Sequence, residues 1–404
     1  MTNNYNVVCA YDGGNGYIKV SIDSRRFIFP SLVSRVLPGN EPQVVEASQV
    51  KAIDKLITDY VQNMDITTQS NSIHTNGRYL VGMNALNSGQ VVTGFNVSST
   101  EGKHNSDVSI ISLLGMLAYN ALQKFWIKNH NLPKDLDVTV DKMATALPIS
   151  EYKIKGVKES YAKRFSAGTH VVIINNFSDP ITVKVKFSKV AVQAEGVIAQ
   201  YGLIGSNLSD EQYRKDGLFD EFKKHNDLKD FTGYDISRKK YILLIDVGEG
   251  TVDFSVLHNT SPVPQINTSI NMGTGNIVEN AIKALRGQYP IIGQIRRQTF
   301  TEIAARGKDK ESETYRQFLN EQLVTLEELI SEQVKSIYAQ LNGQVDMVAL
   351  CGGGIKVLRE AYEKPFSKLI TDLSPFGPAQ ILWVPAKYTQ YLNLDGLEFR
   401  LRYL

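Results

Sequence analysis

A short pattern of acidic and glycine residues occurs twice in the chain. It reads DGGNGYIK from Asp12 to Lys19 and DVGEGTVD from Asp246 to Asp253. An aspartate at a strand end can hold the water shell of Mg²⁺, which takes few protein carboxylates. Glycines let a turn approach a phosphate closely, and consecutive N–H groups there form a concave anion site. The two copies therefore predict a clamp around a metal-bound polyphosphate.

The same pattern also fits a pair of ordinary β-hairpins. Each copy lies between apolar runs, and tight hairpin turns favour glycine and asparagine because they need positive φ. A hairpin alone does not explain why the same carboxylate precedes both turns, so we favour the phosphate clamp. Lys19, on the strand that leaves the first turn, is placed to reach a β- or γ-phosphate as a point charge. The alternative for Lys19 is an ordinary solvated strand residue.

A third glycine cluster, Gly352 to Gly354, follows a strand-like run at residues 345–350 and precedes a helix expected at 355–362. A strand, a glycine turn and a helix start tolerate an anion or a flat ring at the carboxyl end of the strand. The alternative is an ordinary loop. Before this cluster, apolar residues at helical spacing predict a long packed helix over residues 315–341.

Two side chains between the repeated motifs could act on an attacking water. Residues 184–192 alternate between polar and apolar types, which predicts a strand, and residues 197–200 look helical. At the junction, Gln193 or Glu195 could orient the water that attacks a γ-phosphate. The alternative for Glu195 is an acidic residue that stabilises a helix start. The sequence does not choose between Gln193 and Glu195.

Length and composition restrict the class of protein. A chain of 404 residues is too long for one ordinary core, so two domains or a duplicated unit are expected. Its composition, 42% hydrophobic and 21% charged, is that of a globular protein. The formal net charge is +2, with 44 basic and 42 acidic side chains, so direct nucleic-acid binding by a basic surface is not expected.

Several site classes are not indicated by the sequence. Cys9 and Cys351 lie in apolar runs, which favours small buried thiols over a disulfide, and the six histidines lack zinc-site spacing. Neither a P-loop motif nor a G-x-G-x-x-G helix start occurs. There is no signal-peptide pattern and no run of eighteen apolar residues, so we expect a cytoplasmic protein without membrane contact.

The order of these motifs resembles the actin, sugar-kinase and heat-shock-chaperone ATPase superfamily. Its signature is two phosphate hairpins, a connecting segment and a glycine-rich adenosine motif, here at residues 12–19, 246–253, 193–200 and 350–354. Within that superfamily the chain looks most like the bacterial plasmid-segregating actins, the ParM-type proteins. Residues 27–31, 79–82 and 143–152 support this, the last resembling that family's A-T-G-L-P strand. The resemblance spans nearly the whole chain.

The resemblance implies an α/β, actin-like fold of two duplicated ribonuclease-H-like domains with a nucleotide cleft between them. Domain I would comprise residues 1–192 and 388–404, and domain II residues 193–387. The ligand would be ATP, with GTP as an open alternative, together with Mg²⁺. Asp12 and Asp246 would bind the metal through water and take part in the catalytic step. The nucleotide contacts implied in this way are Gly13, Gly14, Asn15, Gly16, Lys19, Gly248, Gly250, Thr251, Gly352, Gly353 and Gly354.

Two residues depart from the family pattern, and one assignment has two candidates. Asn15 replaces a hydroxyl residue common in actins, and Glu249 adds a negative charge beside the phosphates, which leaves the base preference open. Glu195 falls where the P-E/Q-G pattern of such proteins carries the hydrolytic side chain. Gln193 lies nearer the pattern of actin itself.

The resemblance also implies a biological role. Nucleotide-bound subunits would polymerise head to tail, a heterologous contact that generates filaments. The growing filament would push plasmid copies apart through a DNA-binding adaptor protein. A small-molecule kinase is the alternative, but no acceptor motif is apparent, and no peptide-binding domain of the chaperone kind follows residue 396.

Overall fold

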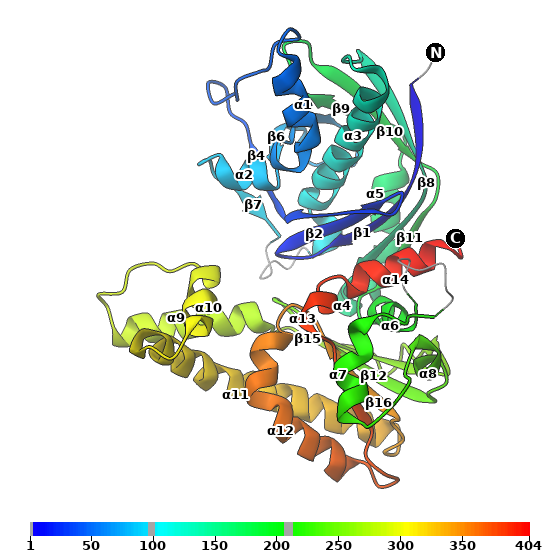
Figure 1. The fold of residues 1–404 in the computed structure, drawn as a ribbon, viewed down its shortest axis with the longest axis vertical. Helices are drawn as coiled ribbons and strands as arrows, with labels where there is room; N and C mark the ends of the chain where they lie inside the picture. The colour runs from blue at the N-terminus through cyan, green and yellow to red at the C-terminus, as the bar shows by residue number, and fades with distance from the viewer. Residues whose placement is uncertain (1–2, 96–101, 206–212) are drawn as a thin grey trace. The chain divides into compact units, whose positions relative to one another are not determined.

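The computed structural model describes residues 3–95, 102–205 and 213–404. Its internal packing divides the chain into two compact units. The first unit comprises Met1–Leu147, Glu151–Ala194 and Leu394–Leu404, and the second comprises Pro148–Ser150 and Glu195–Asn393. Each unit contains one β-sheet with helices packed against it (Figure 1). The mixed α/β fold class expected from the sequence is confirmed.

The sheet of the first unit has eleven strands in the order β3-β2-β1-β8-β10-β9-β5-β6-β4-β7, and β11 also pairs with β8. Strands β1, β2 and β3 form an antiparallel meander, and β8 is parallel to β1. The strands are β1 (Asn4–Gly13), β2 (Tyr17–Ile22), β3 (Arg25–Pro30), β4 (Leu32–Arg35), β5 (Asp65–Gln69), β6 (Gly77–Val81), β7 (Thr93–Gly94), β8 (Asp135–Leu147), β9 (His170–Ile174), β10 (Ile181–Phe187) and β11 (Val190–Ala194).

The long strand β8 changes partner along its length. Its first part pairs with β10, from Asp135 to Val140, and its second part pairs with β11, from Met143 to Leu147. The single strand expected over residues 184–192 is therefore wrong. It is interrupted at Ser188 and Lys189, whose N–H and C=O groups bond to Val140 and Met143 of β8.

The helices of the first unit are α1 (Val50–Thr58), α2 (Met83–Asn87), α3 (Asp107–Asn129), α5 (Val157–Ser166) and α14 (Leu392–Leu401), with α4 (Ile149–Tyr152) at the junction between the units. Short 3₁₀ turns occur at Tyr60–Gln62 and Lys103–Asn105. Helix α3 is long and apolar enough to cross a membrane, with a mean hydropathy of 1.3, but 89% of that stretch is buried. It is the central core helix of this unit.

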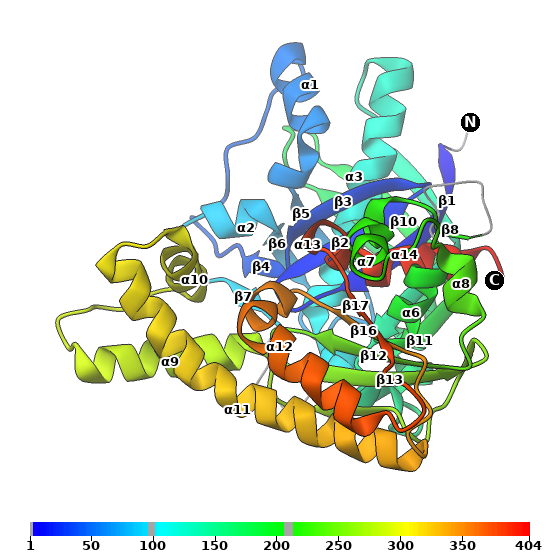
Figure 2. The ribbon, with the colours of Figure 1, turned by 60° about the horizontal axis from the view of Figure 1, so that its bottom comes forward.

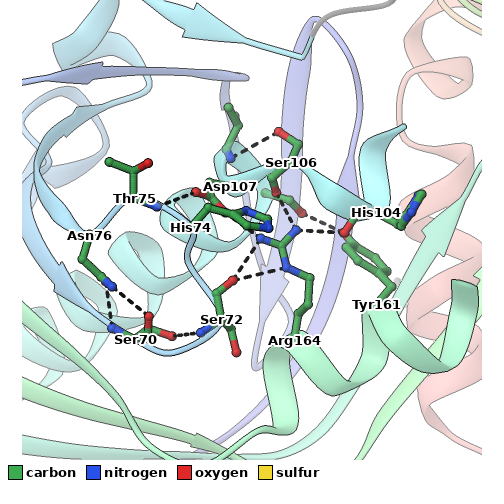
Figure 3. A network of polar contacts seen from close by, with 12 residues as sticks. Ser70, Ser72, His74, Thr75, Asn76, His104, Ser106, Asp107, Tyr161 and Arg164 are labelled. Atoms are coloured by element: carbon green, nitrogen blue, oxygen red, sulfur yellow. Dashed lines mark hydrogen bonds and ion pairs between the residues drawn. The ribbon is translucent and has the colours of Figure 1, made fainter. Parts of the chain in front are cut away.

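Arg164, on α5, ties three segments of the first unit together (Figure 3). Its guanidinium donates hydrogen bonds to the carbonyl oxygens of Ser72, His104 and Ser106, and it forms an ion pair with Asp107 at 2.6 Å. Asp107 is the first residue of α3, and the Ser106 side chain accepts a hydrogen bond from the Val108 N–H. The start of the core helix is therefore fixed by side chains from outside it.

In the second unit the sheet order is β14-β13-β12-β16-β17, with β15 on β13. Strands β12 and β13 form an antiparallel hairpin, and β16 and β17 continue the sheet in parallel with β12. A hairpin beside a parallel strand thus occurs in both units. The strands are β12 (Tyr241–Val247), β13 (Val252–His258), β14 (Ser261–Pro262), β15 (Thr268–Ile270), β16 (Met347–Cys351) and β17 (Gln380–Trp383).

Helices cover both faces of this second sheet (Figure 2). Side chains of β12 alternate between two hydrophobic cores. Leu243 and Ile245 pack in the core that contains α11 (Lys310–Gln340), whereas Ile242 and Leu244 pack in a second core on the other face of the sheet. The helices are α6 (Val197–Ile204), α7 (Asp220–His225), α8 (Gly233–Ser237), α9 (Thr274–Gln288), α10 (Arg297–Arg306), α11 (Lys310–Gln340), α12 (Ile355–Leu373) and α13 (Ala386–Thr389), with a 3₁₀ turn at Gly217–Phe219.

Two helices are longer than the sequence pattern predicted. Helix α11 begins at Lys310, after Asp309 accepts a hydrogen bond from the Ser312 N–H, and ends before Asn342 and Gly343, which both have positive φ. Helix α12 begins at Ile355 as expected but continues to Leu373 through Pro365. Its buried apolar face outweighs the cost of the proline.

Replacement of Arg164 by alanine should lower the free energy of unfolding by about 2–3 kcal/mol, because the carbonyl groups of Ser72, His104 and Ser106 lose this donor and Asp107 loses its ion pair. Urea unfolding followed by circular dichroism would measure this. Lys163→Ala, at the exposed neighbouring position of α5, is the matched control and should change stability by less than about 0.5 kcal/mol. Equal effects of the two variants would contradict the structural role of Arg164.

Candidate functional site

The first and last residues of each repeated motif are partners across a hairpin. Asp12 pairs with Lys19 between β1 and β2, and Asp246 pairs with Asp253 between β12 and β13. Directly opposite residues have their side chains on the same face of the sheet. The spacing of the motif thus places two functional side chains together beside the turn of each hairpin.

The first hairpin carries an acid–base pair. Lys19 Nζ lies 3.0 Å from Asp12 Oδ2, and the two side chains are 17% and 4% exposed. Lys19 is therefore an ion-paired residue and not an ordinary solvated one. Because the ammonium group neutralises Asp12, the aspartate stays buried without leaving an unpaired charge.

The turn of the first hairpin is closely packed, and Ser31, between β3 and β4, hydrogen-bonds to it. A Cβ atom on Gly14 would lie 2.6 Å from the Tyr17 carbonyl oxygen and 3.6 Å from Lys19 Nζ. The buried Ser31 hydroxyl donates to the Gly14 carbonyl, and the Ser31 N–H donates to the Gly16 carbonyl at 3.0 Å. The sequence pattern at residues 27–31 does not by itself predict this supporting role of Ser31.

The second hairpin carries two acids instead of an acid and a base. Asp253 is buried, and it accepts hydrogen bonds from the hydroxyls of Thr251, at 3.2 Å, and Ser269. Burial raises the pKa of Asp253 to about 7, and the charges of Glu195 and Asp246 add to the effect, while the two hydroxyl donors oppose it. Near neutral pH this carboxyl therefore carries its proton for much of the time.

The third glycine cluster packs directly against the second hairpin. Gly352 has a φ of 101°, and a Cβ atom there would lie 2.5 Å from Asp246 Oδ1. The Gly354 N–H donates to the Val247 carbonyl at 2.9 Å, and a Cβ on Gly354 would meet the Thr274 side chain. Gly353 has open space around its Cα. The structure thus requires glycine at positions 352 and 354, which pack against Asp246 and Val247 at the end of β12.

The start of α9 also packs against the second turn, a contact that was not predicted from the sequence. The N–H groups of Thr274 and Gly275 donate to the carbonyls of Gly248 and Glu249, at 3.0 and 2.9 Å. A Cβ on Gly273 would lie within 2.6 Å of the Glu249 backbone. The sequence Gly273-Thr274-Gly275 before an amphipathic helix was the available signal.

Gln193 and Glu195 fall on different sides of the division between the units. Gln193 lies on β11 and pairs with Ala146 of β8 in the first unit. Glu195 lies in the turn before α6, in the second unit, and its charge contributes to the raised pKa of Asp253. Glu195, Asp246 and Asp253 therefore form an acidic cluster within the second unit. Which of the two positions the water stays a prediction.

The donor set suits a cation that retains its water. Among the residues that the structure describes, no group of three or more His, Cys, Asp or Glu side chains could hold a metal ion directly. Asp12 and Asp246 each stand at the end of a strand, and Asn393 Nδ2 lies 3.5 Å from Asp246 Oδ2. Mg²⁺ takes few protein carboxylates and keeps several waters, so each aspartate, taken by itself, is of a type that suits the water shell of Mg²⁺. Cys9 and Cys351 are buried free thiols, as expected.

Two family models match the sequence, one in each half. Residues 10–197 match the family described as actin like proteins, N-terminal domain. Residues 244–364 match the family described as archaeal actin homologue MreB-like, C-terminal. No curated protein sequence matches the chain.

Solved structures share the fold of almost the whole chain. The actin-like protein Alp7A is 18% identical with a TM-score of 0.68, over 99% of this chain and 97% of that one. A non-polymerisable quadruple mutant of pCBH ParM is 19% identical with a TM-score of 0.61, over 98% and 100%. Bacillus thuringiensis ParM with ATP is 13% identical with a TM-score of 0.59, over 98% of each chain, and its structures with AMPPNP and ADP are also similar.

These similarities define the class of protein. Two sheets, each with a glycine-turn hairpin beside a parallel strand and helices packed on it, form an actin-like fold in this chain. The chain belongs to the actin-like proteins, whose N-terminal domain model matches residues 10–197, and the C-terminal model of an archaeal actin homologue matches residues 244–364.

The acidic cluster should make stability depend on pH through Asp253. The folded state holds this proton more tightly than the unfolded chain, so the stability it contributes is present below a pH of about 4 and lost as the pH rises through about 7. Asp253→Asn removes that titration. Its free energy of unfolding, relative to the unmodified protein, should therefore increase by about 2 kcal/mol between pH 5 and pH 8.

Urea titrations of both proteins at several pH values measure this difference. Groups that titrate alike in the two proteins cancel in the comparison, so the unmodified protein is its own control. A difference that does not change with pH would contradict the protonation of Asp253.

Proposed function

We propose that this actin-like protein binds and hydrolyses ATP or GTP with Mg²⁺ and polymerises into filaments that segregate plasmid DNA. The observation that carries the proposal is the pair of hairpins with functional side chains opposite each other beside their turns. The ATP, AMPPNP and ADP structures of Bacillus thuringiensis ParM, which share the fold, support nucleotide binding.

Each hairpin has a distinct task in this proposal. The first turn, at Gly13, Gly14, Asn15 and Gly16, presents N–H groups to phosphate oxygens, and Lys19 can turn from Asp12 toward a stronger anion. The second turn presents Gly248, Gly250 and Thr251. The metal, when bound, neutralises charge on the phosphates. Asp12 and Asp246 would hold its waters, and residues 352–354 would lie beside the nucleoside.

Hydrolysis requires a side chain that orients the attacking water, in a site whose negative charge does not repel the phosphate group. Glu195 is our first candidate, because it lies in the acidic cluster with Asp246 and Asp253. The proton on Asp253 lowers the repulsion that three carboxylates would exert on a phosphate group. Gln193, on β11, is the second candidate.

The cellular role follows by family analogy. A DNA-binding adaptor would connect the filament to the plasmid, because a net charge of +2 gives the protein little attraction for DNA itself. The buried position of α3 supports a protein that works in the cytoplasm without membrane contact. The non-polymerisable ParM variant among the similar structures is consistent with polymerisation as the family's working state.

Addition of Mg-ATP or Mg-GTP should increase right-angle light scattering, with phosphate release and filaments visible by electron microscopy. The nucleotide that produces all three effects identifies the fuel. Flat scattering with steady turnover would instead support the kinase alternative, and flat scattering without turnover would reject both activities.

Asp246→Ala should reduce phosphate release at least a hundredfold while the circular dichroism spectrum stays unchanged, because it removes a carboxylate from the metal's water shell. Asp179→Ala, at an exposed position before β10 and outside the acidic cluster, provides a control for the loss of a carboxylate. Unchanged hydrolysis by a folded Asp246→Ala protein would refute the site.

Glu195→Ala and Gln193→Ala distinguish the two candidates for orienting water. The variant that lacks the orienting group should hydrolyse nucleotide at least tenfold more slowly and yield longer-lived filaments, with little change in nucleotide affinity. Single-turnover hydrolysis and fluorescent-nucleotide titration separate these effects. A loss of affinity alone would assign a structural role to the residue concerned.

A further inference from the structure

The last residue of the second unit, Asn393, lies beside the aspartate that begins the second motif. Its Nδ2 is 3.5 Å from Asp246 Oδ2, and both residues belong to the second unit. The amide nitrogen must face the carboxylate, because an amide oxygen in that place would meet a second acceptor. The contact was not predicted from the sequence, since 147 positions separate the two residues.

The other polar atom of the same amide, Asn393 Oδ1, is a buried acceptor. It is shielded from solvent, and no residue in the described part of the chain donates a hydrogen bond to it. Buried acceptors are nearly always paired with a protein donor or with ordered water, because an unpaired one loses its hydration without compensation. A donor from outside the chain is therefore expected beside Asp246.

The neighbouring side chains favour one kind of donor. Glu195 and Asp253 surround Asp246 with further acidic groups. The hydroxyls of Thr251 and Ser269 already donate to Asp253. A water bound to Mg²⁺ has its oxygen on the cation, so its hydrogens point outward and it acts as a donor. Such a water matches a buried acceptor in an acidic cluster.

The segment that carries Asn393 also holds the opposite side of the Asp246 carboxylate. The Gly352 N–H donates to the Thr389 hydroxyl at 2.5 Å, and that hydroxyl lies 3.2 Å from the Gly352 carbonyl oxygen. Gly352 packs so closely that a Cβ atom there would lie 2.5 Å from Asp246 Oδ1. One carboxylate oxygen therefore faces Gly352, which Thr389 fixes, and the other faces Asn393.

The turn of α14 that follows Asn393 is anchored in the first unit. The Arg26 guanidinium, on β3, forms ion pairs with Asp395, at 2.6 Å, and with Glu398. Both carboxylates are buried, with exposed fractions of 1% and 3%. A charge at that depth is costly when it is unpaired, so these ion pairs fix the start of α14 and Asn393 with it.

We propose that Asn393 is a positioning residue for the nucleotide's metal ion. Its Nδ2 orients the Asp246 carboxylate, and its Oδ1 accepts a hydrogen bond from a water of the Mg²⁺ shell. The inference rests on the proposed binding of a magnesium nucleotide, and it assigns a role to a residue that lies outside the repeated motifs.

Nucleotide affinity with and without metal tests this role. Asn393→Ala should weaken the binding of fluorescently labelled ATP or GTP about tenfold in the presence of Mg²⁺. In excess EDTA the same variant should bind the labelled nucleotide within about twofold of the unmodified protein, because Asn393 contacts the metal's water and not the nucleotide. Equal weakening in Mg²⁺ and in EDTA would reveal a structural role or a direct nucleotide contact, and would overturn the inference.

Two further variants separate polarity from packing. Asn393→Leu keeps a side chain of similar size and should show the same magnesium-specific loss as Asn393→Ala. Recovery of the unmodified affinity with leucine would mean that only packing matters, which contradicts the proposal. Gln390→Ala, which removes an exposed amide from the same segment, is the matched control and should stay within about twofold under both conditions.

A metal titration gives a readout that does not depend on hydrolysis. Mn²⁺ can replace Mg²⁺, and electron paramagnetic resonance measures the free ion. With nucleotide present, the Mn²⁺ concentration for half-saturation should rise about tenfold in Asn393→Ala. An unchanged value would overturn the inference and leave the proposed function intact. If the unmodified protein binds neither labelled nucleotide in Mg²⁺, the proposed function fails, and the inference fails with it.

Discussion

A buried carboxylate beside the turn of a hairpin is the constraint on which both halves of this site depend. Asp12 and Asp253 are each 3% exposed, and an ionised carboxylate at that depth is costly unless it is paired. The first hairpin meets the requirement with the Lys19 ammonium. The second meets it with hydroxyl donors from Thr251 and Ser269 and with a retained proton. One backbone arrangement therefore supports two different charge states.

Around the second hairpin, backbone segments lie in direct contact with one another, and glycines make this contact possible. Around the second hairpin, the outer glycines of the late cluster and Gly273 all stand where a Cβ atom would collide with neighbouring atoms. The turn at Gly248 and Glu249 is held by N–H donors from the start of α9. Strand β16 and helix α9 are thus brought to one turn, which leaves little freedom for its carbonyl groups.

Local patterns predicted the parts of this fold that depend on local sequence. Both hairpins and the helix of residues 315–341 were expected, and the helix extends from Lys310 to Gln340. The supporting roles of Ser31, Ser269 and Thr274 were not predicted, because tertiary packing brings these residues to the turns from elsewhere in the chain. The apolar character of α3 was missed because Ser109, Ser112 and Asn120 interrupt its pattern, and these polar residues are themselves buried. The charge state of Asp253 depends on burial, which no spacing reveals.

Helix α11 gives the second unit a mechanical property that its length alone sets. Its hydrogen bonds run along its axis, and buried side chains such as Leu326, Ile330 and Val334 brace it against the core. It therefore acts as a strut between the two ends of the unit. Each residue inserted into it would lengthen the strut by about 1.5 Å and rotate one end relative to the other by about 100°. A change in the length of α11 would therefore change both the separation and the relative orientation of the elements that it connects, α10 and β16.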